Sequence, residues 1–194
     1  MESQGVKVGV LLDRRLDDVG EWFADATAFE AAGADVLWLD PLAEPGLDPM
    51  AVLAALAART SRSLLVGALP ASDRPPAQLA PTITTIRRLS QGRLALIADR
   101  DWPGELVTLV AGLGISRYVP DGQDGYDHRR GGERVERWAR TAAPEGRAAW
   151  RAALANAAEG GVEGLLVPAG PRLLDILRNP NDPGGRDDLH LAQG

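Results

Sequence analysis

Residues 6–12 read Val-Lys-Val-Gly-Val-Leu-Leu, a nearly continuous apolar run that only Lys7 and Gly9 interrupt. Runs of this kind are typical of strands that are buried on both faces of a sheet. Similar runs recur along the chain, with helical spacing between them. The sequence therefore predicts strands at Val6–Leu12, Asp35–Asp40, Leu64–Leu69, Leu94–Ala98, Ile115–Val119 and Val162–Val167.

Helical stretches separate these runs. Asp17 or Asp18 can cap a helix that ends near Gly33, and Asp48 before Pro49 is a good N-cap for the next. Further helices are predicted at Pro76–Leu89, Glu105–Leu113, Glu133–Arg140, Arg147–Glu159 and Pro171–Leu177, with a Gly-, Asp- and Arg-rich loop at Asp121–Gly132. This alternation predicts an α/β fold in which helical crossovers join the strands of a parallel sheet.

The amino-acid composition argues against several classes of protein. The 194 residues are 45% hydrophobic, which suits one sizeable core. We expect a single domain over residues 1–178 and an irregular tail over 179–194. The absence of cysteine excludes disulfides and thiolate metal sites, and a net charge of −6 argues against nucleic-acid binding. Without an apolar run of about 18 residues or a signal peptide, we expect a cytoplasmic protein that does not enter the membrane.

A series of short motifs runs through the first hundred residues. Among them are Lys7-Val8-Gly9-Val10, Glu30-Ala31-Ala32-Gly33-Ala34-Asp35, Leu65-Val66-Gly67 and Leu89-Ser90-Gln91-Gly92-Arg93. In this order and spacing they resemble the luciferase-like monooxygenase family of TIM-barrel oxidoreductases, and Gly161–Val167 resembles the last strand of such a barrel. The resemblance implies FMN or a deazaflavin coenzyme as cofactor, a small-molecule substrate and a flavin reductase as partner.

The chain departs from the family pattern in three respects. No histidine follows the second strand, where Asp40-Pro41-Leu42-Ala43-Glu44 stands, and the long insertion after the fourth strand is missing. Six strands are predicted, whereas a family barrel has eight. We therefore expect a TIM-barrel-like fold that is shortened or incomplete, with exposed strand edges that a homodimer would cover.

In a barrel of this class the site lies at the C-terminal ends of the strands. Asp40 and Asp99 end the second and fourth strands and are the catalytic candidates as general acid or base. Asp is also common after strands as a helix cap or turn residue, and this alternative stays open. The candidate flavin contacts are Asp13, Leu69, Pro70, Trp102, Arg129, Arg130 and Gly170.

The candidate contacts include one group for the flavin ring and another for its phosphate. Leu69 and Pro70 would supply an apolar wall, and Pro70 can adopt a cis bond. The phosphate would bind at Arg129-Arg130-Gly131-Gly132 or at the helix start Gly170-Pro171-Arg172. His128 and His190 are expected on the surface, and Trp38 is expected to face the helices.

Three functions follow from these observations. The first is a flavin-dependent oxidoreductase or monooxygenase, and it rests on the resemblance. The second is a non-catalytic shortened homologue that binds flavin or another small ligand, or serves as a partner subunit. The third is an enzyme acting on a phosphate-bearing ligand on the same scaffold, because a fold alone does not choose a function.

Overall fold

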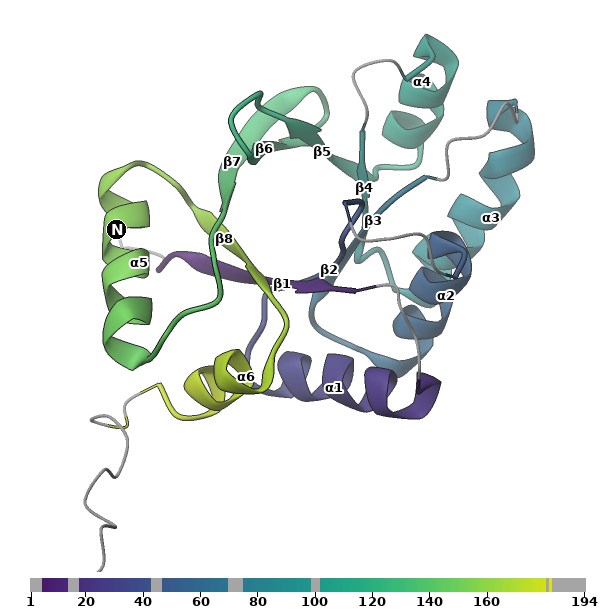
Figure 1. The fold of residues 1–194 in the computed structure, drawn as a ribbon. Helices are drawn as coiled ribbons and strands as arrows, with labels where there is room; N and C mark the ends of the chain where they lie inside the picture. The colour runs from purple at the N-terminus through teal and green to yellow at the C-terminus, as the bar shows by residue number, and fades with distance from the viewer. Residues whose placement is uncertain are drawn as a thin grey trace, which may run out of the picture.

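The computed structural model describes residues 5–13, 18–42, 47–69, 75–98, 102–180 and 182. Within them, eight strands close into a barrel in sequence order (Figure 1). The strands are β1 Lys7–Leu12, β2 Val36–Leu39, β3 Leu64–Ala68, β4 Leu94–Ile97, β5 Ser116–Pro120, β6 Gly125–Arg130, β7 Glu133–Arg140 and β8 Gly164–Pro168. The helices are α1 Val19–Ala31, α2 Pro49–Arg59, α3 Pro76–Leu89, α4 Gly104–Gly112, α5 Arg147–Glu159 and α6 Pro171–Arg178.

The barrel closes through a long parallel pairing of its first and last strands. The β1–β8 register runs from Lys7 opposite Gly164 to Leu11 opposite Pro168. Every neighbouring pair of strands is parallel except the two that involve β6, which is antiparallel to both β5 and β7. The α/β TIM-barrel-like fold predicted from the sequence is therefore confirmed, in a form with fewer helices than strands.

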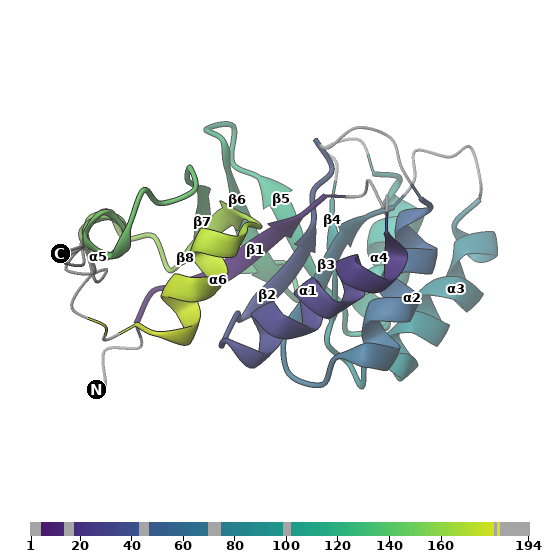
Figure 2. The same cartoon turned by 60° about the horizontal axis from the view of Figure 1, so that its bottom comes forward.

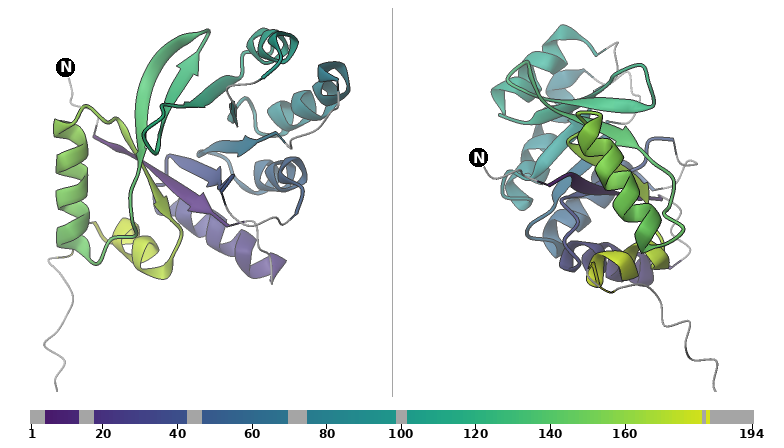
Figure 3. Two further views of the ribbon diagram at one scale, coloured as in Figure 1. Left: turned by 45° about the horizontal axis from the view of Figure 1, so that its top comes forward. Right: turned by 90° about the vertical axis from the view of Figure 1, so that its left-hand side faces the viewer.

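The expectation of six strands is wrong, because the segment from 121 to 140 forms a β-hairpin. It contains β6 where a loop was predicted and β7 where a helix was predicted. Gly131 and Gly132 both have positive φ, at 59° and 93°, and they join Arg130 to its cross-strand partner Glu133. Two glycines with positive φ form the tight turn that suits a two-residue hairpin. Figure 3 shows the hairpin as a long curved ribbon.

The closed barrel removes the reason for expecting a homodimer. An exposed strand edge invites pairing with a second chain, but β1 and β8 hydrogen-bond to each other. The helices α1 to α3 pack around β1–β4, whereas no helix follows β5 or β6 in the chain (Figures 1 and 2). None of the helices in the described part of the chain is long and apolar enough to span a membrane.

The predicted helix caps are confirmed where the structure describes them. The Asp18 carboxylate accepts a hydrogen bond from the Glu21 N–H at 3.0 Å, and Asp48 accepts from Met50 and Ala51. Apolar faces of the helices then bury against the outer face of the barrel, where Leu37, Leu53 and Ile83 are fully buried. These contacts form the larger of two hydrophobic cores.

The second core fills the inside of the barrel and is rich in aromatic rings. Trp38 lies there with Tyr118 and Tyr126, each ring centroid 4.8 Å from that of Trp38. The expectation that Trp38 faces the helices is therefore wrong. Alternation fixes only that Val36, Trp38 and Asp40 share one face of the strand, and the choice of face depends on the closure of the barrel.

Two glycines make room for the largest of these rings. A Cβ added at Gly164 of β8 would lie 2.3 Å from the Trp138 ring, and one at Gly9 of β1 would lie 2.7 Å from Leu166 and 3.0 Å from Trp138. All three distances are shorter than ordinary carbon–carbon contacts. The indole of Trp138 thus occupies the space that side chains at these positions would take.

Replacement of Gly164 by alanine is expected to destabilise the fold by about 3 kcal/mol, because the buried Trp138 ring occupies the space that the added methyl group needs. Chemical denaturation of the two proteins measures the difference. The matched control is Gly112→Ala in α4, where nothing lies within 4 Å of the added Cβ. That change should be neutral or slightly stabilising, and equal costs at the two positions would contradict the packing of Trp138.

Candidate functional site

The C-terminal ends of β1, β2 and β8 line a small concavity of about 290 Å³. Leu11 and Asp13 enter it from β1, Asp40 from the end of β2, and Pro168 and Ala169 from the end of β8. We call this the C-terminal mouth. Asp13 and Asp40 therefore come together where the sequence placed the site, and Gly170 adjoins them as the N-cap of α6.

Arg140, the last residue of β7, forms an ion pair with Asp40 at the C-terminal mouth. Its guanidinium donates two hydrogen bonds to the Asp40 carboxylate, at 2.7 and 3.2 Å. Two parallel N–H···O bonds of this kind fix both side chains in one orientation. Because β2 and β7 are separated by β1 and β8 in the barrel order, the pair ties together strands that are not neighbours.

The surroundings of Arg140 keep it charged and in place. The hydrogen bonds with Asp40 raise the pKa of Arg140 above its ordinary value, against the opposing effect of burial. Its guanidinium carbon also lies 6.0 Å from the centre of the Tyr126 ring in the barrel interior. Asp40 accepts a further hydrogen bond from the Leu42 N–H at 3.0 Å, so the loop after β2 is anchored to the same carboxylate.

The opposite end of the barrel holds a second polar cluster, centred on Glu136 of β7. Its carboxylate accepts hydrogen bonds from His128 Nδ1 and Trp138 Nε1, each at 3.0 Å, and from Lys7 Nζ. The hydrogen bond with His128 is the main reason that the pKa of Glu136 falls to about 2, despite partial burial. Burial raises the pKa of the Tyr118 phenol well above its usual range, and the charge of Arg130 opposes that rise.

The expectation that His128 lies on the surface is wrong. Its side chain is 6% exposed, and its ring stacks on Tyr118 with centroids 4.5 Å apart and planes within 5°. His128 and Tyr118 are direct cross-strand partners in the β5–β6 register. Reading the segment from 121 to 132 as a loop concealed this position, since a loop residue has no assigned face. His190 lies outside the described residues.

We compared the chain with models of known protein families and with curated proteins. The model of the luciferase-like monooxygenase family matches residues 6–106, just over half of the chain. The chain belongs to this family. The match begins at β1 and ends within α4, so it covers the regular strand–helix units and stops before the hairpin. No curated protein matches the chain.

Three solved structures show distant likeness. EDTA monooxygenase from Chelativorans sp. BNC1 is 19% identical with a TM-score of 0.42, over 48% of this chain and 28% of that one. A riboflavin lyase with modified FMN and riboflavin is 22% identical with a TM-score of 0.43, over 57% and 33% of the two chains. Monooxygenase RslO1 from Streptomyces bottropensis is 22% identical with a TM-score of 0.40, over 90% and 65%. The chain thus spans a third or less of the first two proteins.

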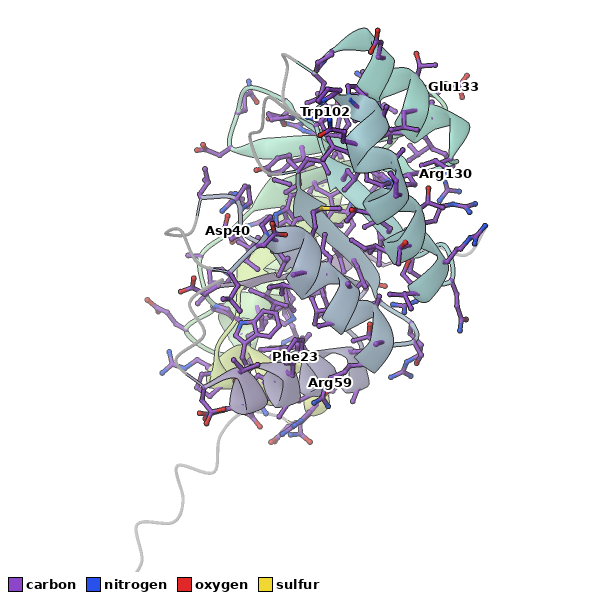
Figure 4. All side chains as sticks on the ribbon, turned by 90° about the vertical axis from the view of Figure 1, so that its right-hand side faces the viewer. Phe23, Asp40, Arg59, Trp102, Arg130 and Glu133 are labelled. Carbon is purple, nitrogen blue, oxygen red and sulfur yellow. The ribbon has the colours of Figure 1, made fainter. Side chains whose placement is uncertain are left out.

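The luciferase-like barrel brings only some of the predicted site residues together. Asp13, Asp40 and Gly170 lie at or beside the C-terminal mouth, whereas Leu69 and Trp102 pack against the outer core between barrel and helices. Arg129 and Arg130 end β6, which runs antiparallel, so they lie at the N-terminal end of the barrel. Figure 4 shows Asp40 and Arg130 on opposite sides of the molecule. Asp99 and Pro70 lie outside the described residues.

Sequence reasoning missed Arg140, Tyr126 and Glu136. All three lie on the hairpin strands with side chains toward the barrel interior or its ends. The Gly131-Gly132 pair was the signal that could have found them, because it predicts a hairpin and therefore a two-residue period on either side. Asp121 forms the turn between β5 and β6, where it accepts hydrogen bonds from the Gln123 and Gly125 N–H groups.

The pKa of Glu136 predicts a pH dependence of stability. A carboxyl whose folded pKa lies below its unfolded value stabilises the fold above the unfolded pKa, and the stabilisation is lost as pH falls toward the folded value. Glu136 should therefore contribute fully above pH 4.5 and lose its contribution down to about pH 2. We expect Glu136→Gln to cost on the order of 2 kcal/mol at pH 7, with a smaller difference near pH 2.5.

Urea denaturation of the native protein and Glu136→Gln across this range measures the effect. The control is Glu133→Gln on the same strand, since Glu133 is exposed. A stability difference between the native protein and Glu136→Gln that stays constant from pH 7 to pH 2.5 would argue against the role assigned to Glu136.

Proposed function

We propose that the protein is a flavin-dependent oxidoreductase whose cofactor and small-molecule substrate bind at the C-terminal mouth. Membership of the luciferase-like monooxygenase family is the observation that carries the proposal. The position of the mouth supports it, since TIM-barrel enzymes place their sites at the C-terminal ends of the strands. The Arg140–Asp40 pair supplies a fixed polar group at that place.

The described residues of the mouth fit the two halves of a flavin. Leu11, Pro168 and Ala169 offer apolar surface for a planar ring. Helix α6 begins two residues after Ala169, and the N–H groups of Arg172 and Leu173 in its first turn have no carbonyl acceptor within the helix. A phosphate fits such a helix start, especially after the last strand of a barrel. All the residues named as lining this concavity of about 290 Å³ belong to the described part of the chain.

A bound flavin would supply hydride transfer or reaction with oxygen, and the protein would supply position and exclusion of water. The aromatic core under the mouth keeps water out from below, because Trp38, Tyr126 and Trp138 are buried. Arg140 can donate its remaining N–H groups to an anionic part of the ligand while Asp40 holds it in place. Asp13 and Asp40 offer carboxylate oxygens to a hydroxyl or amine of the substrate.

FMN and a deazaflavin coenzyme both suit this arrangement, and FMN is the form we propose first. We propose a flavin reductase as the reducing partner. We also propose a homodimer, whose interface does not involve exposed strand edges because β1 and β8 pair with each other. We also propose a second function, because Asp40, which binds Arg140, stands after β2 where the family pattern has a histidine. That function is a non-catalytic homologue that binds flavin or another small ligand.

Visible absorption spectra of the purified protein, recorded with and without FMN or the deazaflavin coenzyme, test the proposal. We expect bound flavin that NAD(P)H or a flavin reductase can reduce. Arg140→Gln should weaken binding by about tenfold, because it removes the fixed cation at the mouth. The control is Arg137→Gln on the same strand, whose side chain instead lies 3.6 Å from Asp121.

Each outcome of these experiments tests one part of the proposed function. Failure of both coenzymes to bind would overturn the cofactor assignment. Binding without reduction would overturn the oxidoreductase and favour the non-catalytic homologue. Equal loss of affinity in Arg137→Gln and Arg140→Gln would place the flavin elsewhere than the C-terminal mouth.

A further inference from the structure

A second cavity opens at the N-terminal end of the barrel, away from the proposed flavin site. Its volume is about 420 Å³, within the range of small-ligand pockets. It lies among the first residues of the parallel strands, such as Lys7 and Leu64, and the last residue of the antiparallel β6, Arg130. We call it the N-terminal cavity. Nothing in the proposed function uses it.

The lining of the N-terminal cavity carries more positive than negative side chains. Lys7, Arg62, Arg93 and Arg130 line it together with two carboxylates, Asp35 and Glu136. The carboxylates are already engaged inside the protein: Glu136 accepts from three side-chain donors, and Asp35 accepts from the Val8 N–H at 2.8 Å. A ligand entering this cavity therefore meets cations whose charge is not fully balanced.

Arg130 is the cation best placed to receive a ligand. Its residue is exposed and lines the cavity, and it forms no hydrogen bond or ion pair with any residue that the structure describes. Its neighbour Arg129 differs, because it donates to Asp127 at 3.3 Å and to the Gly132 carbonyl at 3.2 Å. The alternation of a strand turns these two successive side chains to opposite faces.

Buried polar atoms without partners point to the same cavity. His128 Nε2, Tyr118 Oη and Arg93 Nε have essentially no exposed surface and no hydrogen-bond partner among the described residues, and all three residues line the N-terminal cavity. Buried polar groups are nearly always hydrogen-bonded, so each exception calls for an explanation. The Arg93 guanidinium is otherwise held firmly by the Thr60 and Ser63 carbonyls, both at 2.7 Å. His128 is likewise held at Nδ1 by Glu136.

From these observations we propose that the N-terminal cavity binds a small anion bearing a phosphate or carboxylate group. Arg130 binds the anionic group at the entrance. The ligand also brings an acceptor to the Tyr118 hydroxyl and a partner to His128 Nε2, after a small rotation of the stacked rings. The ligand is small because the cavity is near the lower end of the ligand-pocket range.

Isothermal titration calorimetry with sodium phosphate and sodium succinate as probes, and glycerol as the neutral control, tests the proposal. We expect saturable binding of at least one anion and none of glycerol. Arg130→Gln should weaken binding by about tenfold, whereas the matched control Arg129→Gln changes it by less than about twofold. Binding of neither anion, or equal effects of the two substitutions, would overturn the proposal.

Two further measurements separate a ligand site from general charge attraction. Tyr118→Phe should weaken anion binding without lowering the melting temperature, because the lost hydroxyl has no partner among the residues that the structure describes. The imidazole signal of His128 in ¹⁵N nuclear magnetic resonance should move on titration with the anion. An unchanged His128 signal at saturation would also overturn the proposal. FMN affinity at the C-terminal mouth should be the same in Arg130→Gln, so the two proposals fail independently.

Discussion

Closure of the barrel through the β1–β8 pairing is the constraint on which the rest of the structure depends. The pairing requires a narrow interior at Gly9 and Gly164, and the indole of Trp138 fills the space that these glycines leave. Once Trp138 is inside, Glu136 and Arg140 on the same face of β7 must point to the two ends of the interior. The buried Trp138 ring thus sets the positions of Glu136 at the N-terminal cavity and Arg140 at the C-terminal mouth.

The hairpin of β6 and β7 lets a short chain complete an eight-stranded barrel. A parallel connection needs a crossover of a dozen or more residues, whereas an antiparallel one needs a tight turn. The Gly131-Gly132 turn replaces such crossovers, and it also reverses β6. Reversal carries the C-terminal end of β6, with Arg130, to the N-terminal end of the barrel. The chemistry of the two ends therefore differs from that of a regular (β/α) repeat.

The two ends also differ in how their charges are balanced. At the C-terminal mouth, Arg140 and Asp40 form a matched pair, joined by two hydrogen bonds across strands that are not neighbours. At the N-terminal cavity, Glu136 is saturated with donors, but Arg130 and three buried polar atoms lack partners among the described residues. An unpaired buried polar atom costs on the order of 1–3 kcal/mol, which the fold must offset elsewhere. The packed aromatic interior separates the two ends.

The sequence by itself determined the regular half of the molecule. The apolar runs and caps predicted β1 to β4 and helices such as Pro76–Leu89, because burial on both faces and helix capping leave local signatures. It also placed Asp13 and Asp40 at one mouth, since parallel strands end together. Only the tertiary structure decided the buried positions of His128 and Trp38 and the pairing of Asp40 with Arg140. Those features depend on contacts between residues up to 100 positions apart, which no local pattern records.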